Sequence, residues 1–442
     1  MATDARAIQV YNPMGWGSSY WMAQAQSVTP RPALPAGVTL IPGGGADPVH
    51  PFAGAGNEYI VKIAAGGGGF QVGGVGGPYG AGNTPTATKR WSLVWSGIIW
   101  LPAYPASEGT LLYANTDPYV LNVTPTGTLK LYTGSGLPLV GTSTAALPTG
   151  QWVQLEVWEG YRDSAGNLLT TKQWMVRTAT LAAPPIYTTY LNVNANPSQN
   201  LAAGGFNAAW GSTGGTAPYF ANPALYLCNV WGGWEDADNP IGVHRQDVQR
   251  PSTVKGVGHL NQWAGNCANV NEVLPDDATT EDTWSNPGSA TASQLYQLTN
   301  PLYIAAADLT ANSVVVGNDL YEPAPAKGVT NDLSPLVSNG VVDISGNALG
   351  TTAAWMETLW MVLSNLLNGG ADVPWTLAQL QGLQAGAQAQ TNDSAIGNEI
   401  FHMSTVAVLV PYQKAGETGS ALPAPDNFPA APYHVHNTLI RL

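Results

Sequence analysis

Charged side chains are scarce in this sequence: Asp, Glu, Lys and Arg make up 10% of its 442 residues, against about 25% in an average soluble domain. Long surface helices depend on such charges for their exposed faces, so the composition favours β-structure. The few charges are mostly acidic, with a formal net charge of −13. A protein of this charge is repelled by phosphate backbones and by anionic membranes, so we expect neither nucleic acid nor a membrane as partner.

Cysteine and long apolar segments are also lacking. Cys228 and Cys267 are too few for a disulfide scaffold and lack the spacing of a zinc site. A bridge between these two residues stays open, although a reducing cytosol opposes it. No apolar run reaches about 18 residues, and the opening MATDARAIQV has no signal-peptide core. We therefore expect synthesis in the cytoplasm without a signal peptide and without membrane insertion.

Glycine and proline, by contrast, are abundant, with 51 and 34 residues, and they separate short runs rich in Val, Ile, Thr, Tyr and Trp. Such runs are typical of antiparallel strands joined by turns. Within Gln151 to Glu159, apolar and polar residues alternate, which places one face of this strand in a core. The other expected strands of a first sandwich are Trp91 to Leu101, Thr110 to Ala114, Tyr119 to Pro125, Gly127 to Gly134, Thr171 to Leu181 and Ala224 to Trp234.

The pattern changes along the chain predict a mainly β protein with two modules. We expect an antiparallel β-sandwich of the jelly-roll, laminin-G-like type, then a smaller β-rich α+β module with one or two helices. The expected segments are an N-terminal extended, glycine-rich arm with first strands (1–89), the sandwich (90–250), a linker with an acidic loop (251–297), the second module with buried helices (298–415) and a C-terminal tail (416–442).

The N-terminal segment contains the glycine-rich stretch Ala64 to Asn83. Glycine at this density does not sustain a helix and loses much conformational entropy when ordered. This stretch is either a surface loop or an arm that becomes ordered on a neighbouring subunit. Trp16, Tyr20 and Trp21 favour docking of the arm, because aromatic side chains gain free energy on burial.

The second module contains the two segments that most resemble helices. Thr352 to Asn368 is apolar around most of a helical circumference and ends at a glycine pair, so a buried helix is expected. A second helix should begin at Thr376, with Gln379 completing a capping box. Strands are expected at Leu302 to Leu309, Ser313 to Gly317 and Ser404 to Tyr412.

Catalytic residues are not apparent. A glycosidase needs two carboxylates that converge in one cleft, whereas Glu156 and Glu159 differ by an odd number of positions and should diverge from one strand. Adjacent residues in Glu235 to Asp238 should diverge in the same way. The sequence therefore predicts no enzyme, with polysaccharide hydrolysis as the least favoured alternative.

Metal and cofactor sites are not indicated either. The acidic cluster between Glu272 and Asp282 lacks the ligand spacing of a calcium loop, and a solvated turn is preferred for it. His434 and His436 have no third ligand nearby and are expected to be solvated. The glycine-rich stretch lacks the lysine and the following helix of a phosphate loop. We predict no cofactor and no metal.

Three tryptophans near loops remain as candidate contacts. Trp210, Trp231 and Trp234 could form a platform for a sugar ring or a protein partner, since large amphipathic rings are used in this way. Burial in the sandwich core is the preferred interpretation, because aromatic side chains of a sandwich usually fill it.

The strand runs also carry a family resemblance. RWSLVWSGIIWLP, GTLLYA, GTLKLYTG, LPTGQWVQLEVW and ALYLCNVWG together resemble concanavalin-like, laminin-G-type sandwiches. The stretch from His244 to Trp284 is similar to a passage that follows such a sandwich in structural proteins of tailed bacteriophages. Pro374-Trp375-Thr376 and the final strand Ser404 to Tyr412 extend this resemblance.

This resemblance implies a structural component of a tailed phage particle, located in the tail, neck or capsid surface. Its expected partners are further copies of itself and other virion proteins, and its expected location is the virion. The alternative is an adhesin or lectin that binds a glycan of the host envelope. Both interpretations fit a neutral surface without a catalytic constellation.

Overall fold

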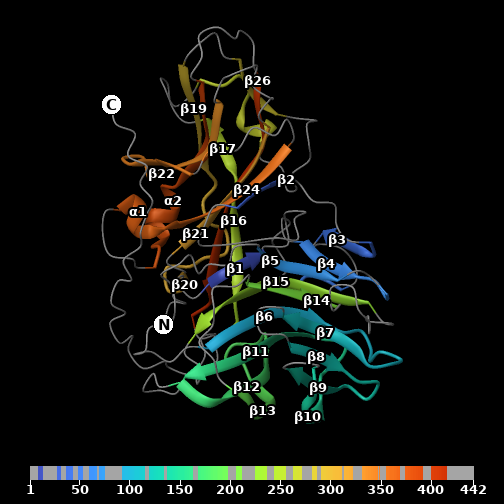
Figure 1. Cartoon of the computed structure of the whole chain (residues 1–442). Helices are drawn as coiled ribbons and strands as arrows, with labels where there is room; N and C mark the ends of the chain where they lie inside the picture. Colours follow the sequence, from blue (N-terminus) through green and yellow to red (C-terminus); the bar gives the residue numbers. More distant parts are fainter. Residues whose placement is uncertain are drawn as a thin grey trace.

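The structure is a computed structural model that describes twenty-two segments of the chain. These are residues 8–12, 27–30, 36–42, 48–52, 59–66, 69–74, 92–114, 119–133, 137–162, 168–197, 206–211, 224–235, 243–254, 262–270, 281–285, 290–310, 313–321, 331–346, 348, 355–368, 374–391 and 400–415. The chain folds into two antiparallel β-sandwiches, one in the lower and one in the upper half of Figure 1. The predicted mainly β architecture is confirmed.

The first sandwich consists of an eight-stranded and a six-stranded sheet. The larger sheet has the order β13 (Tyr187–Pro197), β12 (Leu168–Thr180), β11 (Trp152–Arg162), β6 (Ser92–Trp100), β15 (Leu225–Glu235), β4 (Tyr59–Ile63) and β3 (Val38–Pro42), with β1 (Ile8–Asn12) paired to β15. The smaller sheet has the order β10 (Leu139–Ala146), β9 (Thr128–Thr133), β8 (Tyr119–Val123), β7 (Gly109–Ala114), β14 (Phe206–Trp210) and β5 (Phe70–Gly74).

The second sandwich consists of a seven-stranded and a five-stranded sheet. The former has the order β16 (Arg245–Gln249), β26 (Ile400–Gln413), β21 (Ser313–Tyr321), β24 (Trp355–Leu363) and β2 (Ser27–Pro30), while β18 (Asp282–Ser285) and β20 (Leu309–Thr310) also pair with β26. The latter has the order β17 (Pro251–Val254), β19 (Ala290–Leu298), β25 (Gln384–Thr391), β22 (Asn331–Ser338) and β23 (Asp343–Ser345). Two short helices, α1 (Ser364–Asn368) and α2 (Leu377–Gln381), and a 3₁₀ turn, η1 (Cys267–Asn269), complete the described elements.

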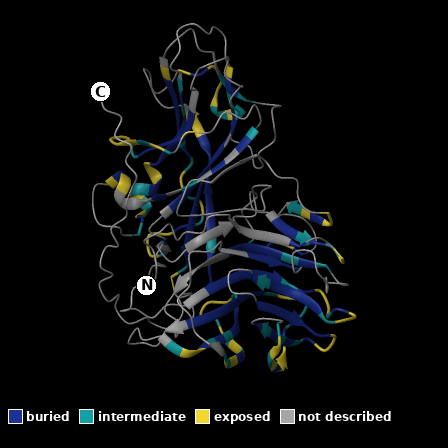
Figure 2. Cartoon of the chain, viewed as in Figure 1, coloured by how far each residue is buried: buried dark blue, intermediate teal, exposed yellow. Residues whose placement is uncertain are grey.

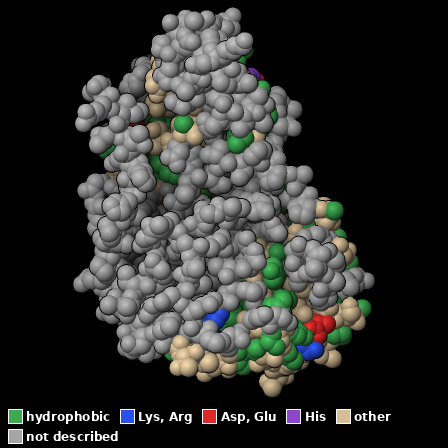
Figure 3. Space-filling view, in the orientation of Figure 1, with side chains coloured by type: hydrophobic (Ala, Val, Ile, Leu, Met, Phe, Trp, Pro, Cys, Tyr) green, Lys and Arg blue, Asp and Glu red, His purple; other side chains and the backbone are tan. Residues whose placement is uncertain are grey.

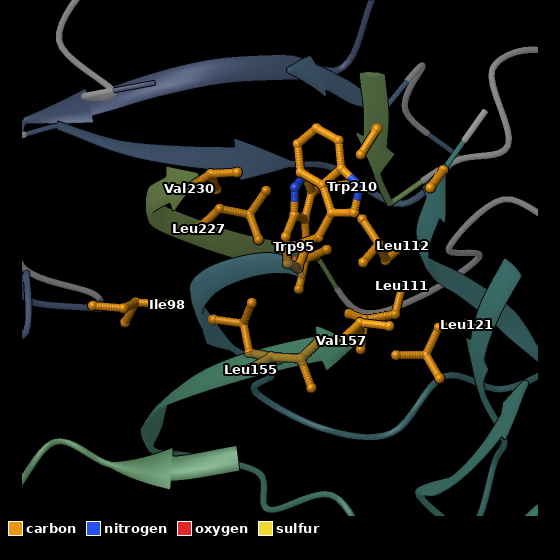
Figure 4. Close-up of a cluster of buried hydrophobic side chains, with 14 of the residues drawn as sticks. Trp95, Ile98, Leu111, Leu112, Leu121, Leu155, Val157, Trp210, Leu227 and Val230 are labelled. Carbon is orange, nitrogen blue, oxygen red and sulfur yellow. The ribbon is translucent and has the colours of Figure 1, made fainter. Parts of the chain in front are cut away.

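Apolar side chains between the two sheets form most of the first core, which also includes side chains from the seven-stranded sheet of the second sandwich. Trp95 from β6 and Trp210 from β14 lie at its centre, surrounded by leucines and valines of β7, β8, β11 and β15 (Figure 4). Gly97 makes room for this packing, because a Cβ atom there would lie 3.0 Å from the ring of Trp210. Interiors packed at this density tolerate little added volume. Burial is deepest in the middle of the strands, and the turns are exposed (Figure 2).

One sheet of the second sandwich contributes to both cores. Along β21, Val314 and Val316 belong to the second core, whereas Val315 between them belongs to the first. Strand β26 repeats this alternation, with Ala407 and Leu409 in the first core and the residues around them in the second. Successive side chains of a strand point to opposite faces, so these two strands are covered by apolar groups on both sides.

Backbone contacts of His244 join the two sandwiches at the start of β16. Its N–H donates to Oε1 of Gln154 on β11 at 3.1 Å, and its carbonyl oxygen accepts from Nδ2 of Asn229 on β15 at 3.4 Å. All three residues are buried. The second sandwich therefore covers part of the outer face of the eight-stranded sheet.

The helix predicted for Thr352 to Asn368 is largely wrong. Trp355–Leu363 forms the strand β24, which pairs with β21 on one side and β2 on the other, and only Ser364–Asn368 is helical. The apolar run of this strand has no two-residue period, so its pattern does not distinguish it from a buried helix. The predicted helix at Thr376 is confirmed as α2, with the expected capping box.

The positions of the described strands also differ from what the sequence suggested. Strands β1 to β5 of the expected N-terminal arm pair within the two sandwiches, and Phe70–Gly74 of the glycine-rich stretch is a strand paired with β14. The expected linker contributes β17, β18 and most of β19, so the second sandwich, apart from β2, begins at β16. Leu302 to Leu309 is not a strand, apart from Leu309 at the start of β20. Residues 416–442 lie outside the described part.

Neither described helix has the length and hydrophobicity needed to span a bilayer. Nearly all the described secondary structure is sheet, so any binding or catalytic site in this part of the chain is built on strands and their connections.

Burial of His244 predicts an acid-sensitive fold. Burial lowers the pKa of its imidazole from 6.5 to about 3, so the folded protein keeps it neutral while the unfolded chain binds a proton below pH 6.5. Stability from this residue is present above pH 6.5 and is lost as the pH falls toward 3. The loss amounts to a few kcal/mol, since one pKa unit corresponds to about 1.4 kcal/mol.

Urea unfolding at pH 7.5 and pH 5 measures this effect. The wild-type protein should lose stability between the two values, and His244→Gln and His244→Leu should both lose less. The use of two replacements separates loss of titration from loss of packing. An unchanged pH dependence in both variants would show that His244 does not cause the acid sensitivity.

Candidate functional site

Of the three tryptophans proposed as surface contacts, Trp210 lies in the core. Its side chain has 0% exposure and packs near Gly97 between the sheets, so the prediction of a surface contact is wrong and the preferred prediction of core burial is confirmed for this residue. Trp231 and Trp234 lie on β15, opposite Ser96 and Leu93 of β6. Their side chains are outside the described part, so their contacts stay a prediction.

The carboxylates of Glu156 and Glu159 diverge from β11, as the sequence predicts. Glu156 accepts hydrogen bonds from Nε2 of Gln154 at 2.9 Å, from Nε of Arg177 at 2.6 Å and from Nε1 of Trp158 at 3.2 Å. The guanidinium of Arg177 also lies 4.5 Å from the centre of the Trp158 ring. This network on the outer face of the sheet is fully buried, so it stabilises β11 against β12 and is closed to solvent.

Glu159 forms a second buried ion pair on the other face of the same strand. Nζ of Lys172 on β12 lies 3.0 Å from its carboxylate, and the two side chains are 2% and 1% exposed. Burial lowers the pKa of Lys172 to about 8, which leaves the amine mostly protonated at neutral pH. Tyr119 and Trp174 pack beside this pair with their ring centres 4.9 Å apart, and burial together with Glu159 raises the pKa of Tyr119.

Neither acid therefore faces its neighbour across a cleft. Residues 236–242 lie outside the described part, so the predicted divergence within Glu235 to Asp238 stays untested. Within the described segments, no three His, Cys, Asp or Glu side chains are grouped so that they could hold a metal ion. Both cysteines are free thiols, with Cys228 in the first core and Cys267 donating to the carbonyl oxygen of Ser252 at 3.1 Å.

The eight-stranded sheet does carry an open polar groove at its edge, on strands β12 and β13. The groove encloses about 610 Å³, and we call it the β12–β13 groove. All but one of its lining side chains are hydroxyl or amide groups. The lining residues are Leu169, Thr170, Thr171, Gln173, Asn192 and Asn194.

Strand alternation and register place the side chains of Thr171, Gln173, Asn192 and Asn194 on one face of the sheet. Gln173 lies opposite Asn194, and Asn192 lies opposite Met175, while the intervening Lys172 and Trp174 point into the sandwich. Nε2 of Gln173 donates to Oδ1 of Asn192 at 3.1 Å, which fixes the orientation of both amides. Asn192 and Asn194 are exposed and Gln173 is half-buried.

Sequence reasoning missed this groove. The available signal was the pair Asn192 and Asn194 at alternate positions of a strand, together with Thr171 and Gln173 at alternate positions of another. Alternate positions share one face. The pairing of β12 with β13, which brings the two rows together, is visible only in the fold.

Comparison with known proteins gives the following. No family model matches the sequence, and no curated protein matches it. Among solved structures, the carbohydrate-binding module CBM66 from Bacillus subtilis has 10% identity and a TM-score of 0.22, with 45% of this chain and 96% of that chain covered. Alginate lyase vAL-1 from Chlorella virus has 12% identity and a TM-score of 0.30, with coverages of 52% and 100%.

A heptameric SAP-like pentraxin from Limulus polyphemus has 13% identity and a TM-score of 0.22, with coverages of 34% and 71%. At TM-scores this low, the likeness gives no information on ligand or activity. The geometry of the groove must therefore carry the functional argument.

The ion pair next to the groove predicts strong coupling between its two members. Lys172→Met leaves the Glu159 carboxylate buried without its ionic partner, and loss of one member of a buried pair typically costs about 3–5 kcal/mol. Replacement of both, as Lys172→Met with Glu159→Leu, should cost less than the sum of the single changes, because no charge is then left uncompensated. Urea unfolding of the four proteins measures the coupling energy, and simple additivity would contradict it.

Proposed function

We propose that this protein binds a neutral glycan in the β12–β13 groove. The observation that carries the proposal is an exposed groove whose polar lining consists of amide and hydroxyl side chains without a charge. Its volume of about 610 Å³ lies within the range of about 300–1,000 Å³ that is usual for small-molecule sites.

The chemistry of the lining matches a polyhydroxylated ligand. Each Asn or Gln offers an acceptor oxygen and two N–H donors, and each Thr hydroxyl can donate and accept. A sugar hydroxyl has the same dual capacity, so it can bond to either end of an amide. Leu169 adds one apolar side chain to the lining, which suits the C–H groups of a sugar ring.

The same lining disfavours other ligands. A strongly anionic or cationic ligand would lose its hydration without gaining an opposite charge, and the net charge of −13 further opposes polyanions. An apolar ligand would leave the amides without partners. A neutral glycan meets neither difficulty.

The role in a phage particle stays a prediction that rests on the sequence resemblance, as do the virion location and the virion partners. It belongs to a different class of function, since assembly needs protein contacts and not a sugar site. The two roles are compatible, because a particle protein can also bind the glycans of its host.

Mutation of the groove tests the proposal. The full-length protein is applied to an array of neutral oligosaccharides, and the best ligand is then titrated. Asn192→Ala with Asn194→Ala should weaken the affinity by about tenfold to a hundredfold, since two hydrogen bonds of about 0.5–1.5 kcal/mol each are lost.

Thr188→Ala serves as the matched control, because Thr188 is exposed on the same strand β13 but does not line the groove. The control should bind as the wild-type protein does. Equal affinities of the groove variant and the control would refute a site in the groove.

A further inference from the structure

A second polar cluster lies on the opposite face of the first sandwich, on the outer side of the six-stranded sheet. It consists of Glu108 just before β7, Asn122 on β8, and Lys130 and Tyr132 on β9. The alternate residues Leu121, Leu129 and Leu131 fill the core, so strand alternation directs the cluster outward. Acidic and basic side chains lie together among hydrophobic ones at the lower right of Figure 3.

The carboxylate of Glu108 organises this cluster. Its Oε1 accepts from Nδ2 of Asn122 at 2.9 Å and from the hydroxyl of Tyr132 at 2.6 Å, and its Oε2 accepts from Nζ of Lys130 at 2.7 Å. Charge-assisted bonds of this kind are short and strong. Residues from two strands and from the segment before β7 are thereby held in fixed positions.

The cluster is rigid but reachable from solvent. The side chain of Glu108 is 25% exposed and that of Lys130 is 30% exposed. Burial raises the pKa of Glu108, but the hydrogen bonds from Lys130, Tyr132 and Asn122 lower it by a larger amount. The net shift of this pKa is therefore downward. The hydrogen bond to Glu108 raises the pKa of Lys130, so both groups stay charged at neutral pH and cancel each other.

An apolar row lies directly beside these charges. Tyr113, Val120, Tyr132 and Leu139 lie opposite one another across β7, β8, β9 and β10. Leu139 is 49% exposed and both tyrosines are half-buried. The surface therefore joins aromatic and aliphatic groups to fixed donors and acceptors, as amphipathic recognition sites do.

We propose that this cluster is a second carbohydrate site, independent of the groove, which binds two neighbouring hydroxyls of a neutral sugar. One hydroxyl accepts a hydrogen bond from Lys130, and the next donates a hydrogen bond to the Glu108 carboxylate, whose side chain is 25% exposed. The phenol oxygen of Tyr132, which donates its own proton to Glu108, accepts from a third hydroxyl.

The charges select a neutral ligand. A cation gains little from a carboxylate that Lys130 already neutralises, and an anion gains little from an ammonium that Glu108 already neutralises. A diol can bridge both charges without separating them. The exposed Leu139, which lies opposite Tyr132, is placed to contact the C–H face of the same ring.

Four full-length proteins test this site on an array of neutral oligosaccharides. They are the wild type, the groove variant Asn192→Ala with Asn194→Ala, the single variant Lys130→Met, and the combination of all three changes. Lys414→Met is the matched control, because Lys414 forms a comparable pair with Asp308, at 2.8 Å, in the second sandwich.

We expect the groove variant to retain binding to a subset of neutral glycans, and Lys130→Met to weaken that binding at least tenfold on either background. Tyr132→Phe should weaken the same binding about threefold while retaining the ring, and Lys414→Met should change nothing. Thermal unfolding of each variant confirms that the protein is folded.

The outcomes separate this site from the groove. Binding that survives the groove changes but is lost with Lys130→Met supports the cluster. Binding abolished by the groove changes alone overturns the cluster and leaves the groove intact. Residual binding that Lys130→Met and Tyr132→Phe both leave unchanged overturns the cluster as well, as does the absence of any glycan binding.

Discussion

Burial of sheets on both faces is the constraint on which this structure depends. Strands β21 and β26 place alternate side chains in the first and the second core, and β11 is covered by apolar groups on one face and by a polar network on the other. A strand in this position cannot carry free charges, because desolvation of an unpaired ion costs several kcal/mol or more. The low charge of the sequence follows from this architecture as much as from the nature of its surface. The same double burial joins two sandwiches that would otherwise be separate domains.

Charges that do enter such an interior must be paired within it. Glu156 with Arg177 and Glu159 with Lys172 cross-link β11 to β12 from opposite faces, and both pairs use the register that places these strands side by side. Pairs of this kind add little net stability, but they penalise any register that separates the partners. They therefore fix the geometry of β12, whose outward residues form half of the β12–β13 groove. Precision in a binding site requires such support from buried neighbours.

The sequence predicted those parts of the fold whose signals are local. Alternation in β11 and the Thr376 capping box were sufficient, because each depends on residues a few positions apart. The strand β24 was not predictable in this way, since its apolar run has no two-residue period. Strand β2 pairs with β24, more than 300 residues away, and such a partner leaves no local pattern.

The sites were not predictable for the same reason. Glu108 contacts Lys130 only after β7, β8 and β9 have paired, and Asn192 contacts Gln173 only across β12 and β13. Core burial was the preferred prediction for Trp210, although the residue type also suits a surface contact.

The two polar sites lie on the first sandwich, on either side of one edge. Strand β10 of the six-stranded sheet contacts β13 of the eight-stranded sheet, and a Cβ at Gly141 would lie 3.3 Å from Leu191 and Val193. The groove begins on one side of this closed edge and the Glu108 cluster on the other, so the rigid edge fixes their separation. Two sites held in this way raise the effective concentration of a second sugar once the first is bound, provided that the glycan chain can span the edge.

The second sandwich covers a different part of the eight-stranded sheet, around Gln154 and Asn229, and so leaves both sites open. In this arrangement one sandwich supplies the recognition surface, and the other supplies the burial that holds it in place.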